Sequence, residues 1–437
     1  MRGAATRSSR PGPAPTAAPA PLPSGARAPP RRCVVAAVDP PDVAGAESER
    51  LLRLVATALV RLSRLRTPGD PVYPDVVQAA YNHLVLVCLR TGRPAPGSVP
   101  QLARWAAARP LADWWPYLLK DQHIGDLRLV DADTGAPAQE CLEWAVFAPD
   151  PAAEQIENAL LKEALTLCRA AKAPDSYTAF RRLLIERPVL TGVELALLSA
   201  DLDLSLLLDT VKRCYEPVTA AYVSQGRCTL CAGCGCLLVP LRDGGYACTL
   251  DRCRRKPVVV KERLEPGADG GLYLLTRPLR VFITGPGLAE TGLERRLVRL
   301  GLDVAMWPNF DAYDLRVVFP DGRAWGIDVK DRANPALLGR TTTALRGEPP
   351  YDRGLLVVPF YRFMERDGYR EVFHHHLPEG VEGHVSLLTD EEVVRQAKST
   401  LARTVRRTEP ETARPTPRTA RMIQRTTPKP QAGELDA

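Results

Sequence analysis

At 437 residues, the chain is too long for a single ordinary hydrophobic core, so we expect two or three domains. Its 45% hydrophobic content excludes a wholly disordered protein, and no apolar run approaches the ~20 residues of a membrane-spanning helix, so no membrane partner is expected. The formal net charge of +7 is compatible with a polyanionic partner but is too small to identify one.

Both ends of the chain are predicted to be disordered tails. Residues 1–45 are rich in Pro, Ala and Arg, and residues 402–437 are rich in Thr, Pro and Arg. Neither segment can bury enough apolar surface to offset the entropy lost on ordering. Prolines between Pro11 and Pro30 interrupt any helix that an export signal would need, so we expect a cytoplasmic protein.

Residues 46–218 have the apolar spacing of a helical domain. In residues 47–66, apolar side chains recur at positions 51, 54, 55, 58, 59, 62 and 65, which form one stripe on a helix. Further helices are predicted over residues 73–90, 154–171, 176–186 and 192–214. The tryptophans at 114 and 115 are interpreted as core anchors. The pattern predicts an all-α region and does not indicate its task.

Residues 219–265 are predicted to form a small zinc ribbon. Six of the chain's 11 cysteines lie between Cys228 and Cys253, and the pairs Cys231-x2-Cys234 and Cys248-x4-Cys253 flank an Asp-Gly-Gly turn. Four thiolates on two hooks suit tetrahedral zinc, and four protein ligands make the ion structural. Two further cysteines leave the register open: Cys228-x2-Cys231 is also a valid hook, and Cys236 is nearby. We favour 231, 234, 248 and 253, because that set places a glycine after the second cysteine, where a tight knuckle needs one.

Residues 275–401 alternate between strand and helix patterns and are predicted to form an α/β domain. The predicted strands are 280–285, 303–308, 313–319, 324–330, 354–363 and 384–388. A helix is predicted over 288–300, and a last helix begins at the capping box Thr389–Glu392. The basic residues 252 and 254–256 of the preceding module are either a phosphate-binding surface or a solvated face.

The turn Phe319–Arg323 determines how the third and fourth predicted strands pair. Its Phe-Pro-Asp-Gly-Arg sequence suits a three-residue loop, a type I turn followed by a glycine bulge. Cross-strand partners then sum to 642, so Asp314 lies opposite Asp328, and Lys330 shares their face. Asp311 is excluded as the cross-strand partner, because a spacing of three residues turns it to the other face. Facing carboxylates repel, and a divalent cation between them would remove that cost.

The helix before this hairpin supplies a third acid. Glu290 lies near its predicted start and can aim at the hairpin, while Glu294, one turn further on, is the alternative. Lysine is rare beside arginine in this chain, so composition does not account for Lys330.

Together these residues resemble the PD-(D/E)XK restriction-endonuclease-like superfamily, which has an αβββαβ core. In that pattern Glu290 is the helix acid, Asp314 the hairpin acid, and Asp328-Val-Lys330 the acid-x-Lys motif. Tyr313 stands where the superfamily often has proline, so the match departs from the pattern there. The whole arrangement resembles the nuclease of prokaryotic PIWI–restriction-endonuclease (pPIWI-RE) islands, which implies a PIWI-related protein and a DinG-type helicase as partners.

The resemblance implies a metal-dependent endodeoxyribonuclease of a defence system, acting on DNA or an RNA–DNA hybrid. Asp314, Asp328 and Glu290 would bind Mg²⁺ or Mn²⁺, and Lys330 would stabilise charge on the phosphate. Two other classes compete: a catalytically silent zinc-ribbon scaffold that binds nucleic acid, and a transcription-type factor. The sequence leaves open the substrate, its specificity and the oligomeric state.

Overall fold

The computed structural model describes residues 43–64, 73–114, 124–146, 155–381 and 383–408. All of them belong to one compact unit, residues 41–437. The N-terminal tail expected over 1–45 lies outside the described residues up to 42. The last helix runs to Thr408, past residue 402, where the C-terminal tail was expected to begin.

The first helices share a core. They are α1 (Val43–Arg64), α2 (Asp75–Arg90), α3 (Val99–Ala108), α4 (Leu111–Trp114) and α5 (Gln139–Val146). Most of the apolar stripe predicted on α1 is buried, and its neighbours include Leu84, Trp114 and Trp144. Trp114 is therefore a core anchor, as predicted, whereas residue 115 lies outside the described part. None of the helices in the described part of the chain has both the length and the apolar character of a membrane span.

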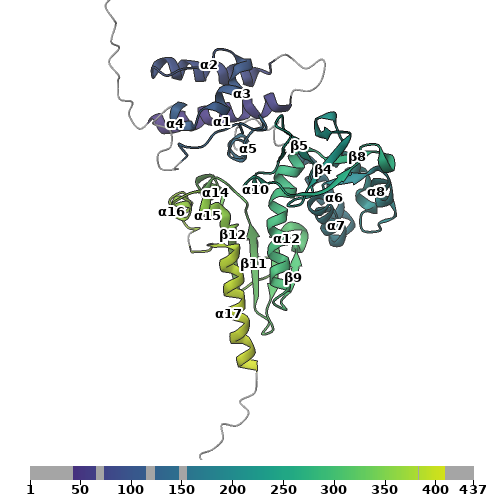
Figure 1. The fold of residues 1–437 in the computed structure, drawn as a ribbon. Helices are drawn as coiled ribbons and strands as arrows, with labels where there is room; N and C mark the ends of the chain where they lie inside the picture. Colours follow the sequence, from purple (N-terminus) through teal and green to yellow (C-terminus); the bar gives the residue numbers. More distant parts are fainter. Residues whose placement is uncertain (1–42, 65–72, 115–123, 147–154, 382, 409–437) are drawn as a thin grey trace, which may run out of the picture. The chain divides into compact units, whose positions relative to one another are not determined.

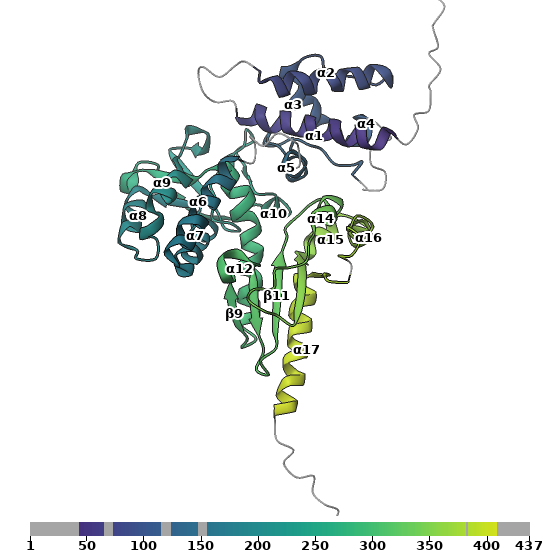
Figure 2. The ribbon, with the colours of Figure 1, turned by 180° about the vertical axis from the view of Figure 1, so that it is seen from behind.

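A second helical group follows, which Figure 2 shows from behind. It contains α6 (Gln155–Ala171), α7 (Pro174–Glu186), α8 (Gly192–Leu197) and α9 (Leu208–Cys214). The prediction of an all-α region was wrong here, because β1 (Val189–Thr191) and β2 (Tyr215–Pro217) flank β8 (Leu272–Leu275) in an antiparallel sheet. Three-residue strands are too short to produce a readable alternation.

The cysteine module consists of short strands and one helical turn. β3 (Val223–Ser224), β4 (Arg227–Cys231) and β7 (Val260–Leu264) form one sheet, and β5 (Leu238–Pro240) pairs with β6 (Tyr246–Cys248). The predicted Asp-Gly-Gly turn joins β5 to β6: Asp243 accepts a hydrogen bond from the Gly245 amide, and Gly244 has a φ of +85°. α10 (Asp251–Arg254) follows.

The C-terminal region contains a five-stranded mixed sheet in the order β13-β12-β11-β10-β9 (Figure 1). The strands are β9 (Asp303–Met306), β10 (Leu315–Val318), β11 (Ala324–Val329), β12 (Arg353–Val358) and β13 (Ser386–Thr389). β9, β10 and β11 are antiparallel, whereas β11, β12 and β13 are parallel. Alternate residues face two cores. Leu355 and Val357 pack with α12 (Gly285–Val298) and α17 (Asp390–Thr408), while Leu356 and Val358 pack with α14 (Pro335–Thr341) and α16 (Tyr369–His375).

Apart from the short turn α13 (Pro308–Asp311) between β9 and β10, the elements from α12 to β12 follow the predicted α-β-β-β-α-β order. The predicted capping box is present, since the amide of Thr389 donates to the Glu392 carboxylate and the amide of Glu392 donates to the Thr389 hydroxyl. The strand predicted over 354–363 ends at Val358. Pro359 cannot donate to the ladder of a central strand, and α15 (Phe360–Glu365) begins directly after it.

The strand predicted over 280–285 was wrong. Residues Arg277–Leu279 form an α-helical turn, Arg280–Thr284 a π-helical turn, and α12 continues from Gly285. The β-branched residues of this segment are buried among helices, which supports a helix that intrinsic propensity disfavours. Pro286 lies just after the π-helical turn, and because it lacks an N–H to donate, it interrupts the hydrogen-bond ladder between that turn and α12.

Candidate functional site: a carboxylate pocket beside the central hairpin

The hairpin β10–β11 has the predicted register. The amide of Phe319 donates to the carbonyl of Arg323 (2.9 Å), the amide of Gly322 donates to the carbonyl of Phe319, and Gly322 has a φ of +85°. Val318 pairs with Ala324 and Leu315 with Ile327. The pairing ends there: the amide of Asp314 donates to the carbonyl of Ile327 (3.0 Å), one residue off the register that would pair Asp314 with Asp328.

Asp314 is fixed between both neighbouring strands. Its carbonyl accepts from the amide of Trp307 (2.7 Å), and its Oδ2 accepts from the amide of Val329 (2.6 Å). The side chain is buried, and burial, followed by the charge of Glu290, raises its pKa well above the usual range. Clustered buried carboxylates of this kind are stabilised by a cation among them.

Lys330 lies at the end of β11 and pairs with Asp328. The distance from Nζ to Asp328 Oδ1 is 2.7 Å. Burial acts to lower the pKa of Lys330, but Asp328 and Asp314 outweigh it and hold the pKa above its usual value. Lys330 is therefore a cation at neutral pH and cannot serve as a proton acceptor there.

Glu290 lies on α12 with both carboxylate oxygens engaged. Arg181 Nη2, from α7, is 3.1 Å from Oε2 and 3.4 Å from Oε1, and Trp307 Nε1 donates to Oε2 at 2.7 Å. Burial raises the pKa of Glu290, and Arg181 opposes that shift. The alternative acid, Glu294, pairs with Arg182 instead and does not line the pocket.

A strained loop between β9 and β10 carries two of these contacts. Trp307, Asn309, Phe310 and Asp311 all have φ between +46° and +68°, a region that non-glycine residues rarely occupy. The loop directs the Trp307 indole to Glu290 and places Asp311 in the pocket wall, where it pairs with Arg181 and accepts from the Tyr177 hydroxyl at 3.0 Å. Backbone strain of this kind clusters at functional sites.

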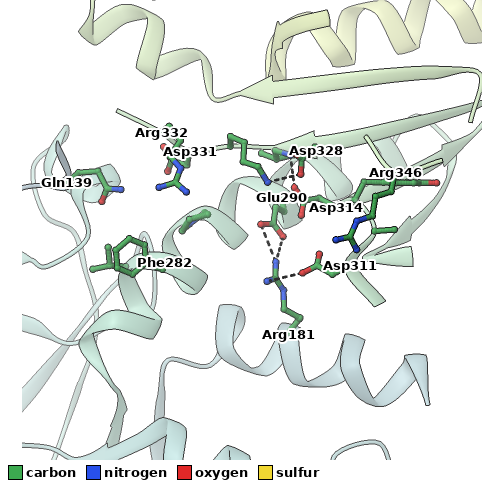
Figure 3. A pocket seen from close by; sticks show the side chains of 16 residues that line it. Gln139, Arg181, Phe282, Glu290, Asp311, Asp314, Asp328, Asp331, Arg332 and Arg346 are labelled. Carbon is green, nitrogen blue, oxygen red and sulfur yellow. Dashed lines mark hydrogen bonds and ion pairs between the residues drawn. The ribbon is translucent and has the colours of Figure 1, made fainter. Parts of the chain in front are cut away.

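These side chains line one pocket of about 340 Å³, shown in Figure 3. All four predicted residues are among its lining: Glu290, Asp314, Asp328 and Lys330. Arg332 and Arg346 also line it. Within the described part of the chain, neither guanidinium makes a hydrogen bond or an ion pair, although the Arg332 carbonyl accepts from the Tyr369 hydroxyl and the Arg332 charge acts to lower the pKa of Glu143. The pocket thus holds a carboxylate cluster with two guanidinium groups beside it.

Sequence reasoning missed Arg181 and Asp311 as pocket residues. Asp311 is not the cross-strand partner of Asp328, as predicted, but it reaches the pocket from a loop. Arg181 comes from a helix more than a hundred residues upstream, and no local pattern marks it. The carboxylates also do not converge fully: among the described residues, no three carboxylate side chains bring their oxygens within 4.8 Å of one another.

In a second cluster, formed by four cysteines, the ligand atoms do lie close together. The Sγ atoms of Cys231, Cys234, Cys248 and Cys253 all lie within 4.8 Å of one another. Gly235 has a φ of +73° and donates to the carbonyl of Cys231, which is the predicted knuckle.

Neither surplus cysteine belongs to this group. Cys228 packs in a separate apolar core, and Cys236 is buried beside the cluster. The four converging thiols are compatible with a zinc ion.

Of the basic residues 252 and 254–256, the three arginines are engaged within the protein, whereas Lys256 is exposed. Arg254 pairs with Asp131 (2.5 Å), Arg255 pairs with Asp251 (2.7 Å), and Arg252 donates to the carbonyl of Gly285 (3.2 Å). These contacts favour a structural role over a phosphate-binding surface.

Comparison with known families assigns both large parts of the chain. Residues 51–191 match the family model described as pPIWI_RE three-gene island domain Y, and residues 287–404 match the model described as REase associating with pPIWI_RE. The chain therefore belongs to the proteins of the pPIWI-RE three-gene islands. No curated protein and no solved structure matches it.

Both matched segments contribute residues to the pocket. Glu290, Asp314, Asp328 and Lys330 fall within the REase match of this pPIWI-RE protein, whereas Arg181 falls within the match to domain Y. The cysteine cluster lies between the two matched segments. The resemblance inferred from the sequence is therefore confirmed.

Proposed function

We propose that this pPIWI-RE protein is a Mg²⁺- or Mn²⁺-dependent nuclease that hydrolyses phosphodiester bonds of DNA, or of an RNA–DNA hybrid, in defence against invading nucleic acid. The observation that carries the proposal is that Asp314 and Asp328 line one pocket, with Lys330 paired to Asp328 at 2.7 Å. The REase match and the α-β-β-β-α-β order support a restriction-endonuclease-like core.

The donor set fits a hard divalent cation. Asp314, Asp328 and the carbonyl of Val329 offer oxygen ligands, which Mg²⁺ and Mn²⁺ prefer, and Glu290 lies in the same pocket. A bound ion of this type would activate a water and offset the charge that develops on the phosphate. Lys330, held as a cation, is suited to stabilise that charge and to orient the phosphate.

The pocket also suits a nucleic-acid backbone. Arg332 and Arg346 lie on opposite sides of the carboxylates in Figure 3. Unpaired guanidinium groups are good ligands for phosphates, and two of them flanking the acids fit the phosphates on either side of a scissile one.

We further propose that the four converging cysteines hold a structural Zn²⁺. The proposed organisation is a helical domain over 46–218, a zinc ribbon over 219–265 and a nuclease domain over 275–401. The association with pPIWI-RE islands supports a PIWI-related protein as partner, and a DinG-type helicase is proposed as a second one.

One observation favours a second candidate, a silent scaffold that binds nucleic acid. Glu290 is held by Arg181 and Trp307, and the carboxylates do not converge. Cleavage of plasmid DNA and of a labelled RNA–DNA hybrid in Mg²⁺ or Mn²⁺ separates the two. Asp328→Ala and Lys330→Ala should abolish cleavage while the circular dichroism spectrum and zinc content persist. Undiminished cleavage in both variants overturns the nuclease assignment, and absence of cleavage by the wild type favours the scaffold.

A further inference from the structure

A buried side chain of domain Y, Arg181, lines the pocket of the REase domain. Arg181 lies on α7, within the match to domain Y, and its guanidinium contacts Glu290 and Asp311 (Figure 3). The Arg181 side chain is 9% exposed, and Glu290 is 5% exposed. A buried charged pair is costly to assemble from water, so it needs a closely matched set of partners.

Two acids and an aromatic ring surround the Arg181 guanidinium, although its Nε is buried without a hydrogen-bond partner within the described part of the chain. One Nη bonds Glu290, the other lies 3.5 Å from Asp311, and the guanidinium lies 5.2 Å from the centre of the Trp307 ring. The Tyr177 hydroxyl, also from α7, donates to the same Asp311. Two residues of one domain Y helix therefore hold two acids that belong to the other domain.

Close packing of α7 against α12 sets the distance between Arg181 and Glu290. Gly287 of α12 lies against Ile185 of α7, and a Cβ at position 287 would be 2.3 Å from Ile185 Cγ1. The Thr284 hydroxyl donates to the carbonyl of Leu184 at 2.7 Å. Because the helices touch within one turn of Arg181 and Glu290, the side chains meet without a gap.

We propose that domain Y supplies Arg181 as a positioning residue of the nuclease site, holding Glu290 and Asp311 against the pocket wall so that the site is complete only with both domains. The inference rests on the proposed nuclease function. The positive charge of Arg181 offsets the negative charges of Glu290 and Asp311, and its hydrogen bonds fix the direction of the Glu290 carboxylate. Domain Y is then a structural part of the catalytic unit rather than a separate binding module.

The chain provides a matched control one residue away. Arg182 lies on the same helix, contacts the same α12 through Glu294 and lies 5.7 Å from the same Trp307 ring. Its side chain is 35% exposed and does not line the pocket. A general loss of packing between α7 and α12 would affect both positions, whereas a positioning role is specific to Arg181.

The test measures plasmid cleavage by the full chain as a function of Mn²⁺ concentration and, separately, Mn²⁺ binding to the DNA-free chain by isothermal titration calorimetry. Arg181→Met should weaken Mn²⁺ binding in the absence of DNA, and Arg182→Met should not; equal Mn²⁺ affinity in the wild type and Arg181→Met would overturn the positioning role. Arg181→Met should lower the cleavage rate and raise the Mn²⁺ needed for half-maximal rate, each by about 10–100-fold, the usual effect of removing a group that orients a metal ligand. Arg182→Met should change both by less than about 2-fold, in keeping with the small contribution of exposed ion pairs. Arg181→Lys keeps the charge and should retain an intermediate rate.

Chemical rescue covers the possibility that Arg181→Met folds poorly. Millimolar guanidinium added to Arg181→Ala should restore part of the cleavage rate and should have no such effect on Arg182→Ala. Cleavage by Arg181→Met at or above the wild-type rate, or equal losses at 181 and 182, would overturn the positioning role. Cleavage by the wild type that Asp328→Ala abolishes, with Arg181→Met unaffected, overturns this inference alone. Absence of wild-type cleavage overturns the nuclease function and this inference together.

Discussion

The Asp314 carboxylate accepts the amide of Val329, the residue after Asp328, at 2.6 Å. The contact ties Asp314 to the backbone beside Asp328, and both side chains line the same pocket. Like charges held close together destabilise a fold, and the charge of Asp328 is one of the causes that raise the pKa of Asp314. The arrangement therefore reduces stability and concentrates charge, a compromise typical of functional sites.

The first prediction follows from this compromise. Asp314→Asn keeps an oxygen to accept the Val329 amide but removes one negative charge. In chelator the variant should unfold at a temperature no lower than the wild type, while Mn²⁺-dependent cleavage should fall by at least about 100-fold, or about 2.7 kcal/mol in the barrier. Asp321→Asn, in the exposed turn of the same hairpin, is the control and should cleave normally. Full cleavage by Asp314→Asn would falsify its assignment as a metal ligand.

Phosphate binding can be tested apart from cleavage. In Ca²⁺ or chelator, the double variant Arg332→Ala/Arg346→Ala should bind duplex DNA more weakly. Its plot of the logarithm of the binding constant against the logarithm of the salt concentration should have a slope shallower by about 1.8, which corresponds to the loss of about 2 phosphate contacts. Arg295→Ala, an exposed arginine on α12 outside the pocket, is the control. An unchanged slope in the double variant would place the DNA elsewhere.

The hairpin register was predictable because it depends on local chemistry. Pro320, Asp321 and Gly322 specify the turn, and the turn sets the pairing as far as Leu315 and Ile327, one residue short of the predicted pair of aspartates. The cysteine set was predictable for a similar reason, since Gly235 marks the knuckle. These features need only a few neighbouring residues.

The features that were missed depend on distant parts of the chain. Residues 280–284 are rich in β-branched and apolar side chains, and only their burial among other helices makes them helical. Arg181 and Asp311 join the pocket through packing between α7 and α12 and through a strained loop. No spacing rule connects residues so far apart in sequence.

The zinc site makes a prediction independent of the nuclease pocket. Cys253→Ser removes one of the four converging thiols and should release zinc and lower the melting temperature, because metal binding contributes folding free energy. Cys228→Ser, at a buried cysteine outside the cluster, should keep about one zinc per chain. Inductively coupled plasma mass spectrometry gives the metal content, and equal zinc loss in both variants would contradict the assigned ligand set.

The close contact between α7 and α12 can be measured with two glycines of one helix. Gly287→Ala places a methyl group against Ile185 and should destabilise the chain by about 1–3 kcal/mol. Gly292→Ala meets no atom within 4 Å and should stabilise the helix by about 0.5–1 kcal/mol. Urea denaturation gives both values, and effects of the same sign would show that the helices are not packed this closely.

The capping box of α17 predicts a pH dependence of stability. Burial acts to raise the pKa of Glu392, but the Thr389 amide and Arg370 outweigh it, so the pKa in the folded state lies below its usual value. The charged form therefore stabilises the fold above the unfolded-state pKa of about 4.3, and this contribution is lost as pH falls through the lower folded-state pKa. Glu392→Gln should be less stable than the wild type at pH 7, and the difference should shrink below about pH 4. A difference that is constant between pH 3 and 7 would rule out the charge as its source.

The most direct test of the central claim is a crystal structure of the full chain soaked in Mn²⁺, with anomalous scattering used to locate and distinguish the metals. We predict a manganese peak bonded to the carboxylates of Asp314 and Asp328, and a zinc peak among Cys231, Cys234, Cys248 and Cys253. The zinc peak is the internal control for data quality. Zinc at the cysteines without manganese between the two aspartates would contradict the account.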